Sequence, residues 1–281
     1  MRQFAAKVHR DLPPTRMWGY DGCSPGPTFE ARCGEALLIE WRNDLPAEHL
    51  FPIDHNLHGA EANKPDVRTV VHLHGGRTPP QFDGHPEAWF TPGHSSAYFY
   101  PNQQDAATLF YHDHAMGITR LNAMAGLVGL YLLRDETERA LPLPTSRYEV
   151  PLVLYDRSFT ADGQLQYPHP WVSEFIGNTI LVNGKIAPFL DVEPRRYRFR
   201  VLKRQGPSAP GGQYDYVING NMVAGFALLA YPAEYGSSGI MTFIVNQNGT
   251  VFQKDLGSDS NQTARQIAAY NPDSSWTPVE E

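Results

Sequence analysis

The chain has 281 residues, 41% of them hydrophobic, which is enough to bury one large core or two ordinary ones. Its formal net charge is -7 and no Lys/Arg cluster forms a basic stripe, so nucleic-acid binding is not expected. No apolar run reaches the roughly 18 residues of a membrane span, and residues 1–10 lack the apolar stretch of a secretory signal, so the sequence supports neither a membrane partner nor export of this chain.

Glycine and proline number 24 each, which predicts many turns and favours an all-β fold. Short apolar runs follow one another through the first half of the chain, as is typical of a β-sandwich. These predicted strands are Ala36–Trp41, Val67–His74, Ala97–Tyr100, Thr108–His112 and Leu127–Leu133. A charged, Pro-containing segment over 134–147 separates them from a second β region over 148–202.

The composition changes beyond Leu202. Residues 204–213 have the Gly, Pro and Ser content of a linker. Two hairpins are predicted after it, one turning at Asn219–Gly220 and the other at 246–249. A short helix is predicted over 261–269, with Ser260 as its cap.

Two His-x-His pairs, at 72–74 and 112–114, lie on or at the end of predicted strands. Alternate side chains of a strand point to the same face, so each pair presents two imidazoles on one side. Two such strands side by side would bring His72, His74, His112 and His114 into one small volume. Because imidazole suits copper, zinc, iron and nickel, the sequence predicts a metal site at these four residues.

The other candidate ligands are weaker. The two cysteines, Cys23 and Cys33, form no C-x-x-C pair, which excludes a Cys-rich zinc site, and extended chain from Phe29 to Cys33 disfavours a disulfide between them. Met116 and Met124 are interpreted as core residues. The remaining histidines are expected to be solvated or structural, namely His9, His49, His55, His58, His85, His94 and His169.

The two histidine pairs resemble the first two copper motifs of the multicopper oxidases. Residues 71–76 and 111–114 carry the motifs. Segments around them agree with the same family at 25–30, 41–46, 83–89 and 100–104. The resemblance covers roughly residues 15–202, and it points to the bacterial spore-coat laccases and their bilirubin-oxidase-like relatives.

The resemblance implies a division of the chain into four parts. Residues 1–140 would form a cupredoxin-like Greek-key β-sandwich, and residues 141–203 would begin a second cupredoxin-like domain. A linker over 204–213 would then lead to a small, hairpin-rich tail over 214–281. That tail resembles the C-terminal part of an uncharacterised bacterial domain family at 216–220, 225–236 and 253–257, so the chain reads as a fusion of two fragments.

Each site residue has a role in the family resembled. His72 matches the ligand of type 2 copper, and His74, His112 and His114 match ligands of the paired type 3 coppers. Asp83 matches an acidic residue that assists proton delivery while O2 is reduced, and a carboxylate suits a reaction that consumes protons. From its neighbours alone, Asp83 reads as a turn residue, since Asp-Gly is a common turn pair.

By this resemblance the chain is a laccase-like, copper-dependent oxidoreductase that couples oxidation of phenolic or similar small donors to O2 reduction. The family needs eight histidines at its trinuclear cluster and a type 1 copper held by two His and a Cys, and this sequence has no H-C-H motif. We therefore expect a truncated form with half of the trinuclear site, no type 1 site and no full mechanism in one chain. A homo-oligomer would be needed to complete the site, and the alternatives are a non-catalytic copper-binding β-protein or an inactive fusion remnant.

Overall fold

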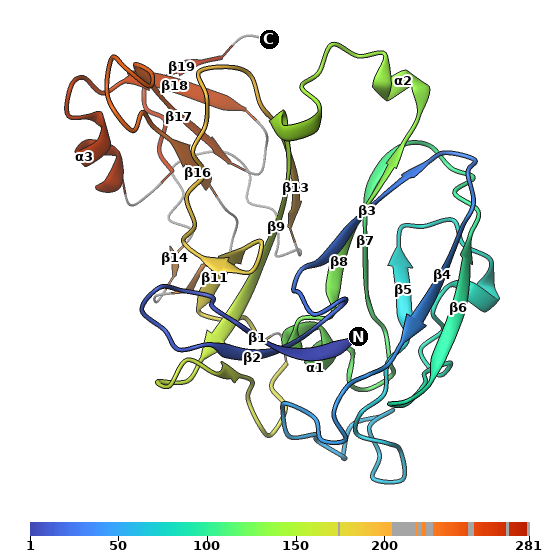
Figure 1. Cartoon of the computed structure of the whole chain (residues 1–281). Coiled ribbons are helices and arrows are strands. Elements are labelled where there is room, and N and C mark those ends of the chain that lie inside the picture. The colour runs from blue at the N-terminus through green and yellow to red at the C-terminus, as the bar shows by residue number, and fades with distance from the viewer. Residues whose placement is uncertain are drawn as a thin grey trace. The chain divides into compact units, whose positions relative to one another are not determined.

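The computed structural model describes residues 1–173, 175–203, 217–218, 221–222, 227–246, 250–267 and 270–279. These residues are mostly strands with a few short helices, which confirms the all-β expectation (Figure 1). The predicted linker over 204–213 and the turn at Asn219–Gly220 lie outside the described residues.

The chain divides into two compact units. The first consists of Met1–Phe175, Ile180–Pro188 and Tyr197–Lys203. The second consists of Ile176–Thr179, Phe189–Arg196 and the described part of Arg204–Glu281. The four-part division expected from the sequence stays a prediction.

Two sheets of the first unit enclose its main core. One has the strand order β3-β8-β7-β5, and the other pairs β4 with β6. The strands are β3 (Gly26–Arg32), β4 (Leu37–Arg42), β5 (Val71–His74), β6 (Ser95–Tyr100), β7 (Ala107–Asp113) and β8 (Val128–Arg134). Both sheets supply aromatic side chains to this core, and the Tyr111 ring lies 4.9 Å from Tyr20, 5.3 Å from Phe29 and 5.4 Å from Trp41.

Strand β8 packs against two hydrophobic cores, which explains the continuous apolar run in its sequence. Tyr131 and Leu133 belong to the main core, whereas Leu130 belongs to a second one. The second core also contains Met17 and Val153. A strand buried on both faces has no polar face to alternate with.

The rest of the first unit surrounds this second core. Strands β1 (Arg2–Ala6) and β2 (Thr15–Gly19) pair with each other. The long strand β9 pairs with β10, β11 and, in parallel, β13, and β12 continues the sheet beyond β11. These strands are β9 (Glu149–Phe159), β10 (Leu165–Gln166), β11 (Thr179–Val182), β12 (Lys185–Ile186) and β13 (Arg198–Lys203).

Short helices interrupt the strands of the first unit. Helix α1 (Thr119–Ala125) precedes β8, and its C-cap is Gly126, whose φ of 126° favours glycine. Helix α2 (Glu136–Arg139) lies in the charged, Pro-containing segment over 134–147, and the Asp135 side chain caps it by accepting a hydrogen bond from the Glu138 backbone N–H. Two 3₁₀ turns complete the set, η1 (Pro80–Phe82) and η2 (Ser146–Tyr148).

The second unit is a small sheet with the strand order β16-β17-β18-β19. Its core contains Ile244 and Tyr270, with Trp276 packed beside them. The elements of this unit are β14 (Val217–Ile218), β15 (Asn221–Met222), β16 (Ala227–Ala230), β17 (Met241–Asn246), β18 (Val251–Asp255), α3 (Ser260–Arg265) and β19 (Thr277–Pro278). Antiparallel pairing of β14 with β15 and of β17 with β18 confirms both predicted hairpins.

One expectation for the second unit was wrong. Ser260 is the first residue of helix α3 rather than its cap, and Asp259 holds the N-cap position without a side-chain hydrogen bond to the helix. The helix also ends earlier than predicted, at Arg265. Within the described residues, no helix combines the length and the apolar character that crossing a bilayer requires.

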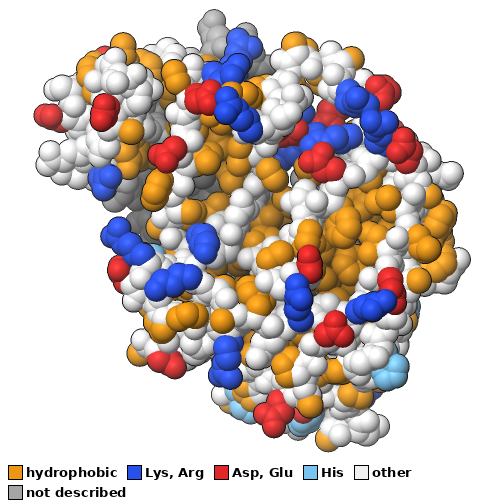
Figure 2. Space-filling view, in the orientation of Figure 1, with side chains coloured by type: hydrophobic (Ala, Val, Ile, Leu, Met, Phe, Trp, Pro, Cys, Tyr) orange, Lys and Arg blue, Asp and Glu red, His pale blue; other side chains and the backbone are white. Residues whose placement is uncertain are grey.

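Charges of both signs alternate on the surface that Figure 2 shows. Lys and Arg side chains lie between Asp and Glu side chains there, and hydrophobic side chains gather around strands β3, β4 and β7. Leu38 and Phe99, which face each other across β4 and β6, are two of the exposed large hydrophobic residues. Both cysteines are free thiols, as expected.

Candidate metal centre

The four predicted histidines come together where β5 and β7 pair. The two strands are antiparallel, and the register places His72 directly opposite His112. His114 lies one residue beyond β7, and its backbone N–H donates to the carbonyl of Val70 at 2.8 Å. Strand alternation puts His74 on the same face as His72.

The imidazoles of this cluster are close enough to share a metal ion. Three ring nitrogens, one each from His72, His74 and His112, all lie within 4.8 Å of one another. Nε2 of His112 is 3.4 Å from Nδ1 of His74. The ring of His114 has its centroid 4.9 Å from that of His72 and 5.6 Å from that of His112.

Backbone carbonyls orient two of the rings. Nδ1 of His72 lies 2.6 Å from the carbonyl oxygen of Asp83, and Nδ1 of His112 lies 2.7 Å from that of Asp113. A carbonyl can only accept, so Nδ1 of each ring donates and Nε2 is left for a metal ion. Metal-binding histidines are commonly fixed by such a bond from the second ring nitrogen.

Burial keeps part of the cluster uncharged. Burial, together with smaller effects of the neighbouring histidines, lowers the pKa of His112 to about 4. Burial also lowers the pKa of His114. Because the neutral imidazole is the form that binds a metal ion, both rings are in the binding form at neutral pH.

Asp83 lies beside His72, at the end of η1. Its carboxylate Oδ1 is 3.4 Å from Nδ1 of His72 and has no hydrogen-bond partner among the described residues. Its backbone N–H donates to Pro80 at 3.4 Å and so closes a turn. This placement is compatible with Asp83 as a turn residue and with Asp83 as an acidic residue that acts beside the histidines.

Asp113 and Asn122 lie behind the four histidines and were not predicted as site residues. Asp113 is fully buried between His112 and His114, and its carboxylate accepts a hydrogen bond from the side-chain amide of Asn122 at 2.8 Å. A signal did exist for Asp113, because strand alternation places it on the same face as the core residues Leu109 and Tyr111. A carboxylate at such a position needs hydrogen-bond donors around it.

The other histidines lie outside the cluster. His49 packs edge-on against Trp18 with ring centroids 4.5 Å apart, and Nε2 of His49 is bonded to Asn122. His58 and His94 are exposed. Met124 is buried in the main core, as expected.

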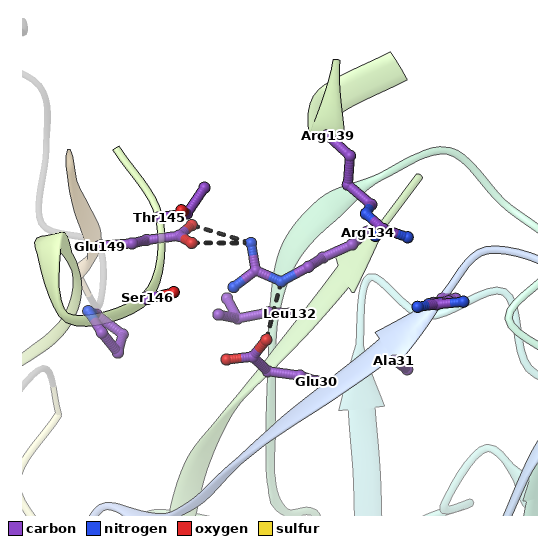
Figure 3. Close-up of a pocket in the computed structure, with 10 residues that line it drawn as sticks. Glu30, Ala31, Leu132, Arg134, Arg139, Thr145, Ser146 and Glu149 are labelled. Atoms are coloured by element: carbon purple, nitrogen blue, oxygen red, sulfur yellow. Dashed lines mark hydrogen bonds and ion pairs between the residues drawn. The ribbon is translucent and has the colours of Figure 1, made fainter. Parts of the chain in front are cut away.

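A separate hollow of the first unit contains none of the four histidines. Residues of β3, β8 and the segment around η2 line it. Figure 3 shows Arg134 between two carboxylates, and the ion pairs measure 3.0 Å to Glu30 and 3.0 Å to Glu149. The histidine cluster is therefore the stronger candidate for chemistry.

Two family models match different parts of the chain. A model described as "Multicopper oxidase" matches residues 56–138, which contain all four histidines. A model described as "Protein of unknown function (DUF2950)" matches residues 188–279. The second match confirms that the tail resembles an uncharacterised family.

Individual proteins give the same result for the N-terminal part. A laccase from Bacillus subtilis (strain 168) is 49% identical over 224 residues, which cover 72% of this chain and 44% of the relative. A laccase from Haloferax volcanii is 46% identical over 216 residues, with 71% and 37% covered. This chain thus spans less than half the length of these relatives.

Solved structures agree on the fold. A multi-copper oxidase from Pediococcus acidilactici matches with a TM-score of 0.60 and 28% identity, covering 72% of this chain and 39% of that one. The McoA multicopper oxidase from Aquifex aeolicus matches with a TM-score of 0.57 and 27% identity, covering 72% and 42%. These likenesses confirm the cupredoxin-like β-sandwich, and the part of the chain that carries the four histidines belongs to the multicopper oxidase family.

Proposed function

We propose that His72, His74, His112 and His114 bind copper as half of a trinuclear site, and that this half-site serves laccase-like oxidation of phenolic or similar donors coupled to O2 reduction. The observation that carries the proposal is the approach of three imidazole ligand atoms to within 4.8 Å on two paired strands. Following the family resemblance, His72 takes the type 2 position and the other three take type 3 positions.

The donor set fits copper. Four imidazoles without a thiolate suit a borderline metal ion, and membership in a copper-using family selects copper among the metals that imidazole binds. His72 and His112 each have Nε2 directed away from the carbonyl that fixes the ring. Copper bound there would supply one-electron exchange with O2.

The protein's own residues would orient the site and handle protons. His72 and His112 are held by the carbonyls of Asp83 and Asp113, which limits rotation of their rings. The carboxylate of Asp83, beside His72 and without another partner among the described residues, is placed to hold a proton and release it toward the cluster. Asp83 is therefore the proposed catalytic residue.

The missing H-C-H motif favours a second candidate function, a copper-binding protein without oxidase turnover. In the family, electrons enter through a copper bound to a Cys, and Cys23 and Cys33 are distant in sequence from both histidine pairs. Steady-state O2 consumption with a phenolic donor distinguishes an oxidase from a copper binder. An inactive remnant would differ from both because it would take up no copper.

The domain assignment belongs to the same proposal. Residues 1–140 would be one cupredoxin-like domain, residues 141–203 the start of a second, and residues 214–281 a tail of other origin after a linker over 204–213. The separate family matches at 56–138 and 188–279 support two parts of different origin, and the second match begins within the proposed 141–203 domain.

Copper stoichiometry after reconstitution tests the proposal. We expect the double variant His74→Ala/His112→Ala to lose tight copper binding, because it removes one imidazole from each strand of the cluster. The matched control is His58→Ala/His94→Ala, which removes two exposed histidines outside it. Wild-type stoichiometry in the first variant would show that the site is wrongly placed.

The colour of the same samples is a second readout. Blue copper sites need a Cys thiolate in a His2Cys set. We therefore expect copper-loaded protein to lack an intense blue band. Appearance of that band would contradict the proposed absence of a type 1 site.

A further inference from the structure

The two strands that carry the histidines are joined by one buried carboxylate. Oδ2 of Asp113, at the end of β7, accepts the backbone N–H of Val70 at 3.0 Å, next to the start of β5. Oδ1 accepts the backbone N–H of Ala115 at 3.0 Å. The Asp113 carboxylate thus connects the residue before β5, which carries His72 and His74, to the segment just after β7, which contains His114.

Asn122 of helix α1 donates a hydrogen bond to this carboxylate. Its Nδ2 donates to Oδ1 of Asp113 at 2.8 Å and to the carbonyl of Arg68 at 3.0 Å. The carbonyl of Arg68 can only accept, so the amide group of Asn122 is fixed with its Nδ2 toward these two partners. Its Oδ1 therefore faces Nε2 of His49, at 3.0 Å.

The orientation of Asn122 also fixes the tautomer of His49. Because Oδ1 of Asn122 accepts, Nε2 of His49 must carry a hydrogen and donate. Burial lowers the pKa of His49, which favours the neutral ring. Nδ1 of the neutral ring then accepts from the backbone N–H of Phe51 at 3.0 Å. Every hydrogen bond from His49 through Asn122 to Asp113 runs in one consistent direction.

This chain of hydrogen bonds lies in the interior. Asp113 and Asn122 are both fully buried. A buried polar group that loses its partner is costly, so a network that is fully satisfied specifies one arrangement of the elements that it joins. The elements here are α1, the Val70 end of β5, and the His112–His114 end of β7.

We propose that Asn122, supported by His49, is a positioning residue: through Asp113 it holds the two histidine-bearing strands in the arrangement that binds copper. The proposal rests on the proposed function. It predicts a loss of copper affinity from a side chain that touches none of the four histidines.

Asn122→Ala tests the proposal against Asn43→Ala. Asn43 is equally buried and also bonds to the backbone, donating to Phe90 and accepting from Leu45, but it has no contact with Asp113. We expect copper titration to show about 10- to 100-fold weaker binding in Asn122→Ala, the usual effect of losing a partner behind the ligands, and near wild-type binding in Asn43→Ala. The EPR spectrum of bound Cu(II) should change in Asn122→Ala alone.

A second pair of variants guards against a failure of Asn122→Ala to fold. His49→Gln keeps an N–H that can donate to Asn122, whereas His49→Leu removes it. We expect His49→Gln to retain copper affinity and His49→Leu to lose it. Equal copper affinity in His49→Gln and His49→Leu would overturn the supporting role of His49.

Amide hydrogen exchange of the metal-free protein separates this proposal from the proposed function. We expect faster exchange at Val70 and His114 in Asn122→Ala, because their hydrogen bonds depend on the joined strand ends, and no change there in Asn43→Ala. Wild-type protein that binds no copper would overturn the proposed function, and the exchange rates would still decide whether Asn122 holds the strands. Unchanged exchange at Val70 and His114, or equal loss of copper affinity in both asparagine variants, would overturn the positioning role.

Discussion

Single residues of the site differ in how far the sequence predicts them. The four histidines could be identified because a period of two on a strand places alternate side chains together, which needs no knowledge of other elements. Asn122 could not be identified, because its partners His49, Arg68 and Asp113 lie 73, 54 and 9 residues away along the chain. Only the packing of α1 against the histidine strands brings them together.

The titration of His49 gives a prediction at this scale. Burial lowers its pKa in the folded protein, whereas the unfolded chain has the ordinary value of about 6.5. The unfolded state therefore takes up a proton first as the pH falls, so the stability that the neutral ring contributes is complete above about pH 6.5 and is lost as the pH falls through the folded pKa. We expect chemical denaturation at about pH 7 and about pH 5 to show a larger loss of unfolding free energy in wild type than in His49→Gln. Equal losses would mean that His49 does not titrate in this way.

The elements of the sandwich were predicted better than the helices. Alternating or continuous apolar runs identified the strands that became β5, β7 and β8, although their ends moved by up to four residues. Helix α1 was missed because its seven residues are too few for a helical period and its apolar end, 123–125, runs directly toward β8. Tertiary contacts rather than local propensity hold such a short helix in place.

The approach of Gly84 to β5 gives a prediction for this element. Gly84 has φ of 75°, and an added Cβ would lie 2.1 Å from the carbonyl oxygen of Val71 and 2.9 Å from Cα of His72. Gly93 has φ of 85°, but an added Cβ would meet nothing within 4 Å. Both Ala variants carry the backbone strain, and only Gly84→Ala also displaces the strand, so we expect it to lose about 1–3 kcal/mol more unfolding free energy than Gly93→Ala. Denaturation curves with equal midpoints would contradict this packing.

Strands β8 and β13 meet β9 through buried charges. The Glu149 side chain is 5% exposed and pairs with Arg134 at 3.0 Å, Arg198 at 3.5 Å and Arg200. Removing the charge of Glu149 leaves the three arginines with Glu30 and Glu138 as their only carboxylate partners among the described residues, so Glu149→Gln should reduce the free energy of unfolding by at most about 3–5 kcal/mol. Glu40→Gln breaks an exposed pair with Arg42 and should change it little. Similar effects of the two variants, measured by urea denaturation, would show that the network contributes no more than a surface pair.

At the scale of the whole molecule, each compact unit has its own hydrophobic core. The first has two extensive clusters, whereas the cluster described in the second has Ile244 and Tyr270 as its fully enclosed members. The composition could predict that the structure changes near Leu202, because Gly, Pro and Ser offer little side-chain surface to bury. It could not predict what the tail does, because hairpins and a short helix are compatible with many functions.

The number of histidines leads to a prediction about assembly. The proposed half-site has four of the eight histidines that the family uses at its trinuclear cluster, and His74 is exposed. A two-fold dimer places the same surface of both copies face to face, so two half-sites at that surface would complete each other. We therefore expect any oxidase activity to fall on dilution below the dimer dissociation constant, because a separated half-site cannot complete the O2 chemistry. Turnover of a phenolic donor should be measured across a dilution series alongside size-exclusion light scattering, with His74→Ala/His112→Ala as the inactive control. Constant specific activity in a proven monomer would show that one chain is sufficient and that the two half-sites do not combine.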